Sequence, residues 1–246
     1  MEPALALPFR TIVINLDRDP ERLVWMTQQL EALGMPFTRQ RGILGTEANS
    51  HFPGLFKNSP LKLGEIGCWA SHLEIARTFA ANPTAAPLLV LEDDVLLPPD
   101  LPALLSELVP ALPEGWDIVR LSNAPKRRVH PVAALPGGRE IVRYTRIPTS
   151  TGASLLSARG AAKFGLLKPH LFAIDAHLAR PWTVGLVTYG VTPAPVTRDC
   201  LGASTIDAMD AGRTLRKHNL LYQIRKNLFD LRYVCGRGEF ITISRN

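Results

Sequence analysis

The sequence predicts an α/β fold with a mostly parallel central sheet, and three observations support this prediction. The chain has 246 residues, 46% of them hydrophobic, which suits one large α/β domain or two small ones and excludes a disordered or fibrous protein. A strand, an acidic turn and a helix are expected at its start. Further on, the apolar residues 88–91 run directly into three carboxylates. Such uninterrupted apolar runs are typical of parallel strands that are buried on both faces.

The first elements follow from local patterns. Residues 9–16 form an apolar, β-branched run that stops at a polar cluster, which predicts a buried strand. A helix should begin after Asp19, a suitable cap, with Pro20 in its first turn, and end at Gly34. Its apolar side chains recur at helical spacing, at Leu23, Met26, Leu30 and Leu33. A second helix is expected over residues 63–81, and the Asn-Pro pair that follows should end it.

The later elements are predicted in the same way. Strands are expected over residues 116–121 and 139–146. The segment between them, residues 123–138, is rich in Pro, Arg, Lys and Gly and should form a surface loop. Residues 149–156 should form a strand that leads into a helix capped near Ser157.

The charge is unevenly distributed along the chain. Lys and Arg number 28 against 22 Asp and Glu, and the whole surplus of +6 lies in residues 211–246. In the remaining residues the acidic and basic side chains are equal in number, which argues against a protein that binds nucleic acid over a broad cationic face. From Leu220 onward the apolar side chains fall on one side of a helical wheel, so we expect a domain over residues 1–205 and a basic amphipathic tail over residues 206–246. Tyr222, Phe229 and Tyr233 lie on the opposite side together with Lys226. This helical tail either contacts an anionic membrane through that side or packs on the domain with both its aliphatic and its aromatic side buried.

The cysteines and the start of the chain bear on its location. The three cysteines lie far apart without a CxxC pair, which argues against a disulfide framework or a cysteine zinc site and favours a reducing compartment. The first residues lack the pattern of a signal peptide, and no run approaches about 18 apolar residues. We therefore expect a cytoplasmic protein, soluble or peripheral on the inner face of the membrane.

The acidic run Glu92-Asp93-Asp94 is the first candidate site. In an extended strand Glu92 and Asp94 point to one face and Asp93 to the other. Adjacent carboxylates repel each other unless a cation offsets them, and Mg²⁺ or Mn²⁺ suits oxygen ligands. The alternative is a solvated acidic turn. The preceding buried strand favours a site, because ligands of open α/β sheets bind at the carboxyl ends of strands.

Two further groups are weaker candidates. On the second helix, Glu65 lies about two turns before His72 on nearly the same face. Taken alone, His72 is more typical of a structural, hydrogen-bonding histidine than of a base. Cys68 is more typical of a core residue than of a nucleophile. Asp175 follows an apolar stretch, where a carboxyl group can have a shifted pKa and act as a base or ligand. It could equally cap the helix that follows.

Five blocks of residues together carry a resemblance to a known family. They are Val13–Arg18 with Glu21–Arg22, Gly64–Cys68 with Ser71–His72, Leu91–Val95, Thr151–Ala153 with Gly160–Ala161, and Ile174–Asp175. In this order, over about residues 11–198, the chain resembles glycosyltransferase family 25, the lipopolysaccharide and lipooligosaccharide sugar transferases related to the collagen galactosyltransferases.

The resemblance implies a fold, a donor and a set of site residues. The fold would be a single Rossmann-type domain of the GT-A type, with a nucleotide-sugar donor that is typically UDP-linked, a Mn²⁺ or Mg²⁺ ion, and inversion at the anomeric carbon. Donor-binding residues, carried over by position, would be Asn15, Leu16, Asp17, Arg22, Glu65, Ser71, His72, Glu92 and Asp93. Asp94 and Glu92 would bind the metal. Asp175 would be the general base, with His177 as the alternative base or a metal ligand.

The resulting functional hypothesis is a metal-dependent inverting glycosyltransferase. It would move a hexose such as galactose to a saccharide acceptor of lipopolysaccharide, lipooligosaccharide or another cell-envelope glycan. A metal-dependent phosphohydrolase or nucleotidyltransferase is the alternative enzyme class, although the second ligand cluster and the Gly-rich phosphate loop that it needs are not visible. A non-catalytic carbohydrate-binding protein on the same fold is the third hypothesis.

Overall fold

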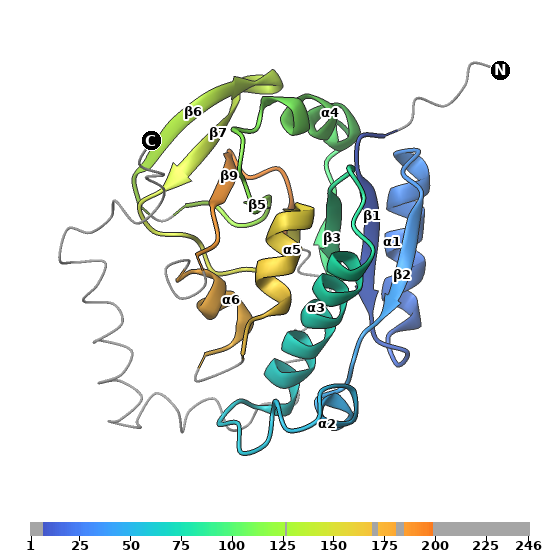
Figure 1. The fold of residues 1–246 in the computed structure, drawn as a ribbon. Helices are drawn as coiled ribbons and strands as arrows, with labels where there is room; N and C mark the ends of the chain where they lie inside the picture. Colours follow the sequence, from blue (N-terminus) through green and yellow to red (C-terminus); the bar gives the residue numbers. More distant parts are fainter. Residues whose placement is uncertain (1–6, 126, 169–171, 181–184, 199–246) are drawn as a thin grey trace.

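The computed structural model describes residues 7–125, 127–168, 172–180 and 185–198 (Figure 1). The predicted domain boundary at residue 205 and the predicted tail at residues 206–246 lie outside these ranges. Within the described part of the chain, no helix is both long enough and apolar enough to span a membrane.

A large mixed sheet forms the centre of the molecule. Its strands, in spatial order, are β2 (Phe37–Arg41), β1 (Arg10–Asn15), β3 (Leu88–Glu92), β8 (Ala153–Leu156), β5 (Ile118–Arg120), β9 (Thr188–Thr192), β7 (Arg139–Tyr144) and β6 (Val129–Leu135). Neighbours are parallel in β2-β1-β3 and between β5 and β9, and antiparallel elsewhere. The expected parallel arrangement therefore holds for β2-β1-β3, while the whole sheet is mixed. A small second sheet pairs β4 (Val95–Leu96) with β10 (Thr197–Arg198).

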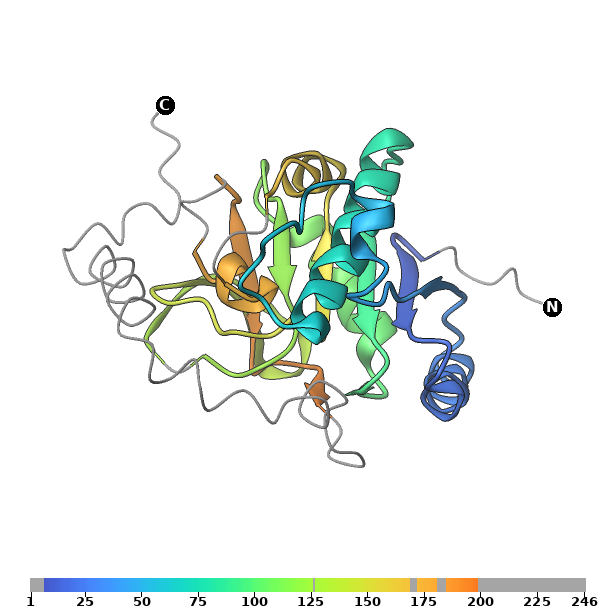
Figure 2. The same ribbon diagram turned by 90° about the horizontal axis from the view of Figure 1, so that it is seen from below.

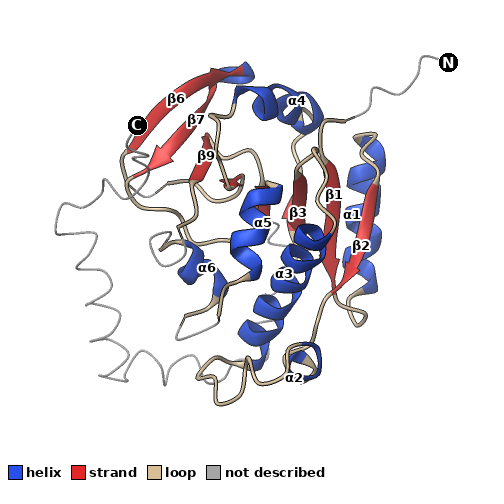
Figure 3. Ribbon diagram, viewed as in Figure 1, coloured by secondary structure: helices blue, strands red, loops and turns tan. Residues whose placement is uncertain are grey.

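Helices cover both faces of the sheet. The helices are α1 (Pro20–Ala32), α2 (Ala48–His51), α3 (Leu63–Ala81), α4 (Leu101–Ala111), α5 (Ala158–Gly165) and α6 (Ile174–Leu178) (Figure 3). One core joins α1 and α4 to the sheet, and a second joins α3, α5 and α6 to its other face. Figure 2 shows α1 and α3 on opposite sides of β1.

The side chains of β3 alternate between the two cores, as its buried apolar run predicted. Leu89 and Leu91 belong to the core beneath α1 and α4, whereas Leu88 and Val90 belong to the core beneath α3. By the same alternation, the next side chain, Glu92, lies on the α3 side of the sheet. The strand ends there, so its carboxyl end presents the acidic run to one edge of the sheet.

The expected ends of two helices are confirmed. Helix α1 starts at Pro20 after Asp19, and Gly34, just beyond its end, has a positive φ of 63°. Helix α5 starts after Ser157, whose side chain accepts a hydrogen bond from the Gly160 amide at 2.9 Å. A side chain at Gly160 would collide with the carbonyl group of Asp117, so this glycine lets α5 lie against the sheet.

The expectation of a surface loop over residues 123–138 is wrong. Residues 129–135 form β6, which pairs antiparallel with β7 at the edge of the sheet. An edge strand can contain Pro131, because one side of the strand needs no hydrogen-bonding partner. The register shifts between Pro131 and Ala133. Strands β2 and β9 were not expected either. The segment of β2 is polar, because this strand lies at the other edge of the sheet and much of it is exposed.

Candidate active site

A cavity of about 220 Å³ lies where β1 and β3 end side by side. This is the edge at which open α/β sheets bind ligands. Of the residues predicted for the site, the cavity is lined by Leu16, Arg22, Ser71, His72, Glu92, Asp93 and Asp94. The others, Asn15, Asp17, Glu65, Asp175 and His177, are not among its lining residues.

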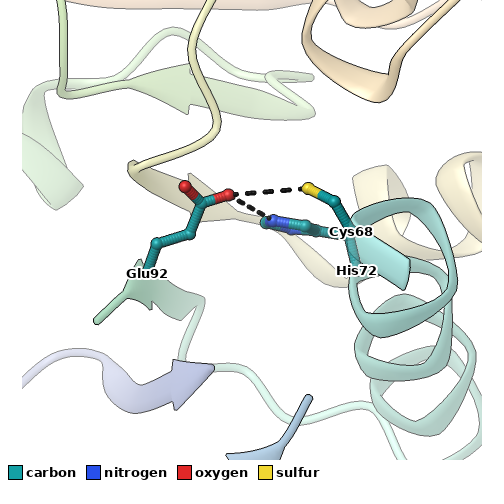
Figure 4. Close-up of side chains that lie close together, drawn as sticks. All are labelled: Cys68, His72 and Glu92. Atoms are coloured by element: carbon teal, nitrogen blue, oxygen red, sulfur yellow. Dashed lines mark hydrogen bonds and ion pairs between the residues drawn. The ribbon is translucent and has the colours of Figure 1, made fainter. Parts of the chain in front are cut away.

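Glu92 meets two side chains of α3 in the wall of this cavity (Figure 4). The His72 Nε2 atom lies 3.1 Å from Glu92 Oε1, and the Cys68 Sγ atom lies 3.8 Å from the same oxygen. Cys68 and His72 are four residues apart on α3, so they project from the same face of the helix. Cys68 packs against the core on the α3 side, as expected, and is partly buried, so it also lines the cavity.

The pKa values of Glu92 and Cys68 are shifted in opposite directions. Burial alone would raise the pKa of Glu92, but hydrogen bonding and positive charge from His72 lower it to about 2. Burial raises the pKa of the Cys68 thiol well above its usual value, and the nearby carboxylates of Glu92 and Asp175 raise it further. Glu92 is therefore ionised, whereas burial and the nearby carboxylates disfavour the thiolate form of Cys68 that a nucleophile would need.

Asp93 points away from α3, toward the start of α1. Its Oδ2 accepts a hydrogen bond from Asn15 Nδ2 at 2.7 Å, and Arg22 Nη1 lies 3.4 Å from its Oδ1. Burial raises the pKa of Asp93, although Asn15 and Arg22 oppose that rise. Asn15 thus holds the acidic turn in place. Glu92 and Asp93 have different partners, but β3 ends at Glu92 and Asp93 lies in the turn, so the strand alternation expected for the acidic run does not extend to it.

Asp94 lies in the turn after β3 and has one carboxylate oxygen to spare. Its Oδ2 accepts a hydrogen bond from Arg198 Nε at 2.8 Å. Its Oδ1 is buried and has no hydrogen-bond partner within the described part of the chain. A buried carboxylate oxygen without a partner is costly, so this atom fits a bound cation.

Several arginines make the same cavity attractive to anions. Arg18, Arg22 and Arg198 all line it. Asp17 lies outside, where it pairs with Arg39 at 2.5 Å and Arg41 at 2.7 Å. These two arginines lower the pKa of Asp17. Guanidinium groups recognise phosphate and carboxylate through paired hydrogen bonds, so the cavity suits a phosphorylated ligand held beside an acidic turn.

Ser71 and Glu65 hold α3 in position. Ser71 Oγ accepts a hydrogen bond from the Ile43 amide and donates one to the Gly67 carbonyl oxygen, both at 2.8 Å. An added Cβ at Gly67 would lie 2.6 Å from the Ile43 carbonyl oxygen, so glycine allows this close approach. Glu65 Oε2 accepts a hydrogen bond from the Lys62 amide at 2.9 Å at the start of the helix.

Asp175 lies on α6, within electrostatic reach of the Glu92 group. Its Oδ1 accepts a hydrogen bond from the Ala176 amide at 2.6 Å, and Ala173 occupies the capping position that the sequence allowed for Asp175. Burial raises the pKa of Asp175, and the charge of Glu92 adds to the rise. Arg120 opposes it. This carboxyl group therefore takes up a proton more readily than an ordinary aspartate.

Arg120 is a buried charged residue within electrostatic reach of Asp175 and Glu92, and its sequence pattern did not single it out. It is 2% exposed, and its Nε and Nη2 atoms have no hydrogen-bond partner among the described residues. Burial lowers its pKa, while the carboxylates of Asp175 and Glu92 act in the opposite direction. An arginine within an otherwise apolar strand was the available signal, because such a charge is rarely fully buried unless other charges compensate it.

His177 packs into the core of the α3 side. It is 5% exposed, and its ring meets the Trp69 ring edge-on with the centroids 5.1 Å apart. Trp69 is itself fixed by a hydrogen bond from its Nε1 to the Phe172 carbonyl oxygen at 3.0 Å. These contacts describe a packed aromatic pair and give the alternative base assignment to His177 no support.

A comparison with protein families matches this part of the molecule. The family model described as glycosyltransferase family 25 (LPS biosynthesis protein) matches residues 9–131, half of the 246-residue chain. The matched range includes β1, β3, α3 and the acidic turn, whereas Asp175 lies beyond it. No curated protein matches the chain.

Proposed function

The chain belongs to glycosyltransferase family 25, and from this premise we propose that it transfers a hexose from a UDP-linked donor to a saccharide acceptor of lipopolysaccharide or a related cell-envelope glycan. The family supports a glycosyltransferase of lipopolysaccharide biosynthesis. The observation that carries the finer proposal is the cavity at the ends of β1 and β3, where an acidic turn faces several arginines.

The donor would bind with its diphosphate among these arginines. Arg18, Arg22 and Arg198 offer guanidinium groups to the phosphate oxygens. Arg22 and Arg198 also pair with Asp93 and Asp94, so both arginines are already positioned at the cavity. A phosphate group can share these cations with the carboxylates when an additional positive charge is present.

A Mn²⁺ or Mg²⁺ ion would supply that charge, and Asp94 fits it best. The spare Oδ1 of Asp94 offers one ligand atom, and such ions are commonly held by one or two carboxylates together with substrate phosphates. A bound ion would stabilise negative charge on the departing diphosphate. Glu92, expected as the second ligand, is grouped with Cys68 and His72, and Asp94 lies outside that group, so we assign this ion to Asp94.

Asp175 would accept the proton of the acceptor hydroxyl. The acceptor oxygen forms a bond to the anomeric carbon while the bond from that carbon to the diphosphate oxygen breaks. The bonding electrons leave with the nucleoside diphosphate, and the proton passes to Asp175, which its raised pKa favours. Attack opposite to the leaving group inverts the anomeric carbon.

The test of this function is a panel of nucleotide sugars offered to the full chain with Mn²⁺, with and without lipooligosaccharide acceptors. We expect glycosylated product from a UDP-sugar, and metal-dependent donor binding that Asp94→Asn abolishes. Asp100→Asn, a change to an exposed carboxylate, serves as the control and should leave binding unchanged. Metal-dependent donor binding that survives in Asp94→Asn would refute the metal assignment, and release of UDP without any glycosylated product would favour a phosphohydrolase.

The basic tail would place the enzyme at a membrane. This proposal rests on the surplus of +6 in residues 211–246, which would attract anionic lipid headgroups on the cytoplasmic side. We expect the full chain to co-sediment with anionic vesicles and a chain that ends at Ile206 to remain in the supernatant. Equal binding by the two chains would contradict a membrane role for the tail.

A further inference from the structure

The proposed transfer reaction leaves the group formed by Cys68, His72 and Glu92 without a role. All three side chains line the cavity, and their possible ligand atoms lie within 4.8 Å of one another. Among the described residues this is the single group of three His, Cys, Asp or Glu side chains with such spacing. We propose that Cys68, His72 and Glu92 form a second metal site, for Zn²⁺ or a similarly thiophilic divalent ion.

The distances between the side chains suit a tetrahedral zinc ion. Ordinary zinc bond lengths place a nitrogen and an oxygen ligand about 3.3 Å apart, and a sulfur and an oxygen ligand about 3.6 Å apart. The corresponding distances here are 3.1 Å from His72 to Glu92 and 3.8 Å from Cys68 to Glu92. Figure 4 shows the three side chains converging from α3 and from the end of β3. The ligand atoms of the third pair, Cys68 and His72, lie within 4.8 Å of each other.

The chemistry of the three ligands separates this site from the one at Asp94. Zn²⁺ accepts thiolate, imidazole and carboxylate ligands, whereas Mg²⁺ and Mn²⁺ prefer oxygen. Cys68 would bind as the thiolate, with its proton passing to the buffer. Three protein ligands leave the fourth coordination position open toward the cavity, as in zinc sites that also bind water or a substrate group.

The group also has supports that hold its ligands in position. Cys68 and His72 are fixed by α3, and His72 is only 7% exposed. Thr151 Oγ1 lies 4.0 Å from the Cys68 sulfur, which places a hydroxyl group next to the proposed thiolate. Ordered neighbours of this kind increase metal affinity by fixing the orientation of the ligands.

The test titrates the untagged, chelator-treated full chain with Co²⁺ and follows the thiolate-to-cobalt absorption band. We expect one Co²⁺ per chain, an intense thiolate band, and its loss when Zn²⁺ is added but not when excess Mn²⁺ is added. Cys68→Ser should abolish the band and weaken Zn²⁺ binding by about 100-fold or more, because even outer partners of a metal site contribute up to about that factor.

Matched variants distinguish metal binding at Cys68 from metal binding at another cysteine or at Asp94. The double variant Cys200→Ser/Cys235→Ser keeps Cys68 and should keep the band, and Asp94→Asn should keep it as well, so a failure of the proposed transferase function would leave this result standing. His72→Gln should weaken Zn²⁺ binding and provides a second variant if Cys68→Ser does not fold. Absence of the band in the natural chain, or its persistence in Cys68→Ser, would overturn the proposal.

Discussion

Glu92 and Asp175 are two carboxyl groups that burial affects in the same way and that end with opposite pKa shifts. Burial favours the neutral form of both. Glu92 has the His72 ring nitrogen at 3.1 Å, and its pKa falls to about 2. Asp175 has a backbone amide and the more general influence of Arg120, and its pKa rises. The nearest hydrogen-bonding partner, and not the depth of burial, decides the direction of each shift.

The opposite pKa shifts suit the two carboxyl groups to different roles. A carboxylate that remains ionised at all ordinary pH values can bind cations and hold charge in place. A carboxyl group with a raised pKa can exchange a proton with a substrate. The directions of the two pKa shifts agree with the proposal that Asp175, and not Glu92, is the base.

The largest effect is expected from Asp175→Asn, which removes the proposed base while keeping a similar shape. Transfer should fall by about 10²- to 10⁴-fold, the usual contribution of a positioned base. Donor affinity should stay within about a factor of two, because Asp175 does not line the donor cavity. Product formation and donor binding, measured on the same preparation, check both parts. A variant with unimpaired transfer would move the base elsewhere.

The same variant should be more stable than the natural chain at neutral pH. A raised pKa means that the folded protein binds the Asp175 proton more tightly than the unfolded chain does. This contribution to stability is present below the unfolded pKa and is lost as pH rises through the raised value. The ionised carboxylate therefore costs stability at pH 7, and asparagine removes the cost. Chemical denaturation at pH 7 and at pH 4 should show a smaller gain at the lower pH.

His72→Gln tests the other side of the comparison, because it removes the partner that lowers the pKa of Glu92. Removing the partner of a buried hydrogen-bonding group leaves that group unsatisfied, and Glu92 is mostly buried, with 19% of its side chain exposed. We expect the free energy of unfolding at pH 7 to fall by about 2 kcal/mol. The double variant His72→Gln/Glu92→Gln should recover part of that loss. Strictly additive effects in the double-mutant cycle would show that the pair is not coupled.

The features of Glu92 and Asp175 that depend on neighbouring residues in the chain could be predicted from the sequence. The apolar run before Glu92 identified β3 and placed the acidic run at its carboxyl end. The apolar setting of Asp175 indicated a shifted pKa without its direction. These features depend on residues adjacent in the chain.

The partners of these groups could not be predicted, because they come from distant segments. Arg198 reaches Asp94 across 104 residues, and Cys68 reaches Glu92 across 24. The polar strand β2 and the proline-containing strand β6 lie at the two edges of the sheet, where pairing with one neighbour outweighs a weak local pattern. Arg120 of β5 comes within electrostatic reach of Asp175 of α6 only in the folded protein, because the two residues lie far apart in the chain.

The pH dependence of transfer gives a smaller and more specific test. Because Asp175 must be ionised to accept a proton, activity should fall as pH decreases through its raised pKa. Arg120 lowers the pKa of Asp175, so Arg120→Met should move this acid limb to higher pH. Arg120→Lys, which keeps the charge, should move it less. An acid limb at the same pH in the Met variant would show that another group controls the rate.

The smallest change in the free energy of unfolding is expected for Asp100, whose ion pair resembles that of Glu92 with His72 but is exposed to solvent. Arg139 Nη1 is 2.5 Å from Asp100 Oδ2, and Asp100 has 48% of its side chain exposed. The pKa of Asp100 is lowered by this hydrogen bond, as that of Glu92 is by His72. Water can replace the partner of an exposed carboxylate, so Asp100→Asn should change the free energy of unfolding by less than about 0.5 kcal/mol. A loss as large as that of His72→Gln would mean that desolvation is not what makes the partner of Glu92 important.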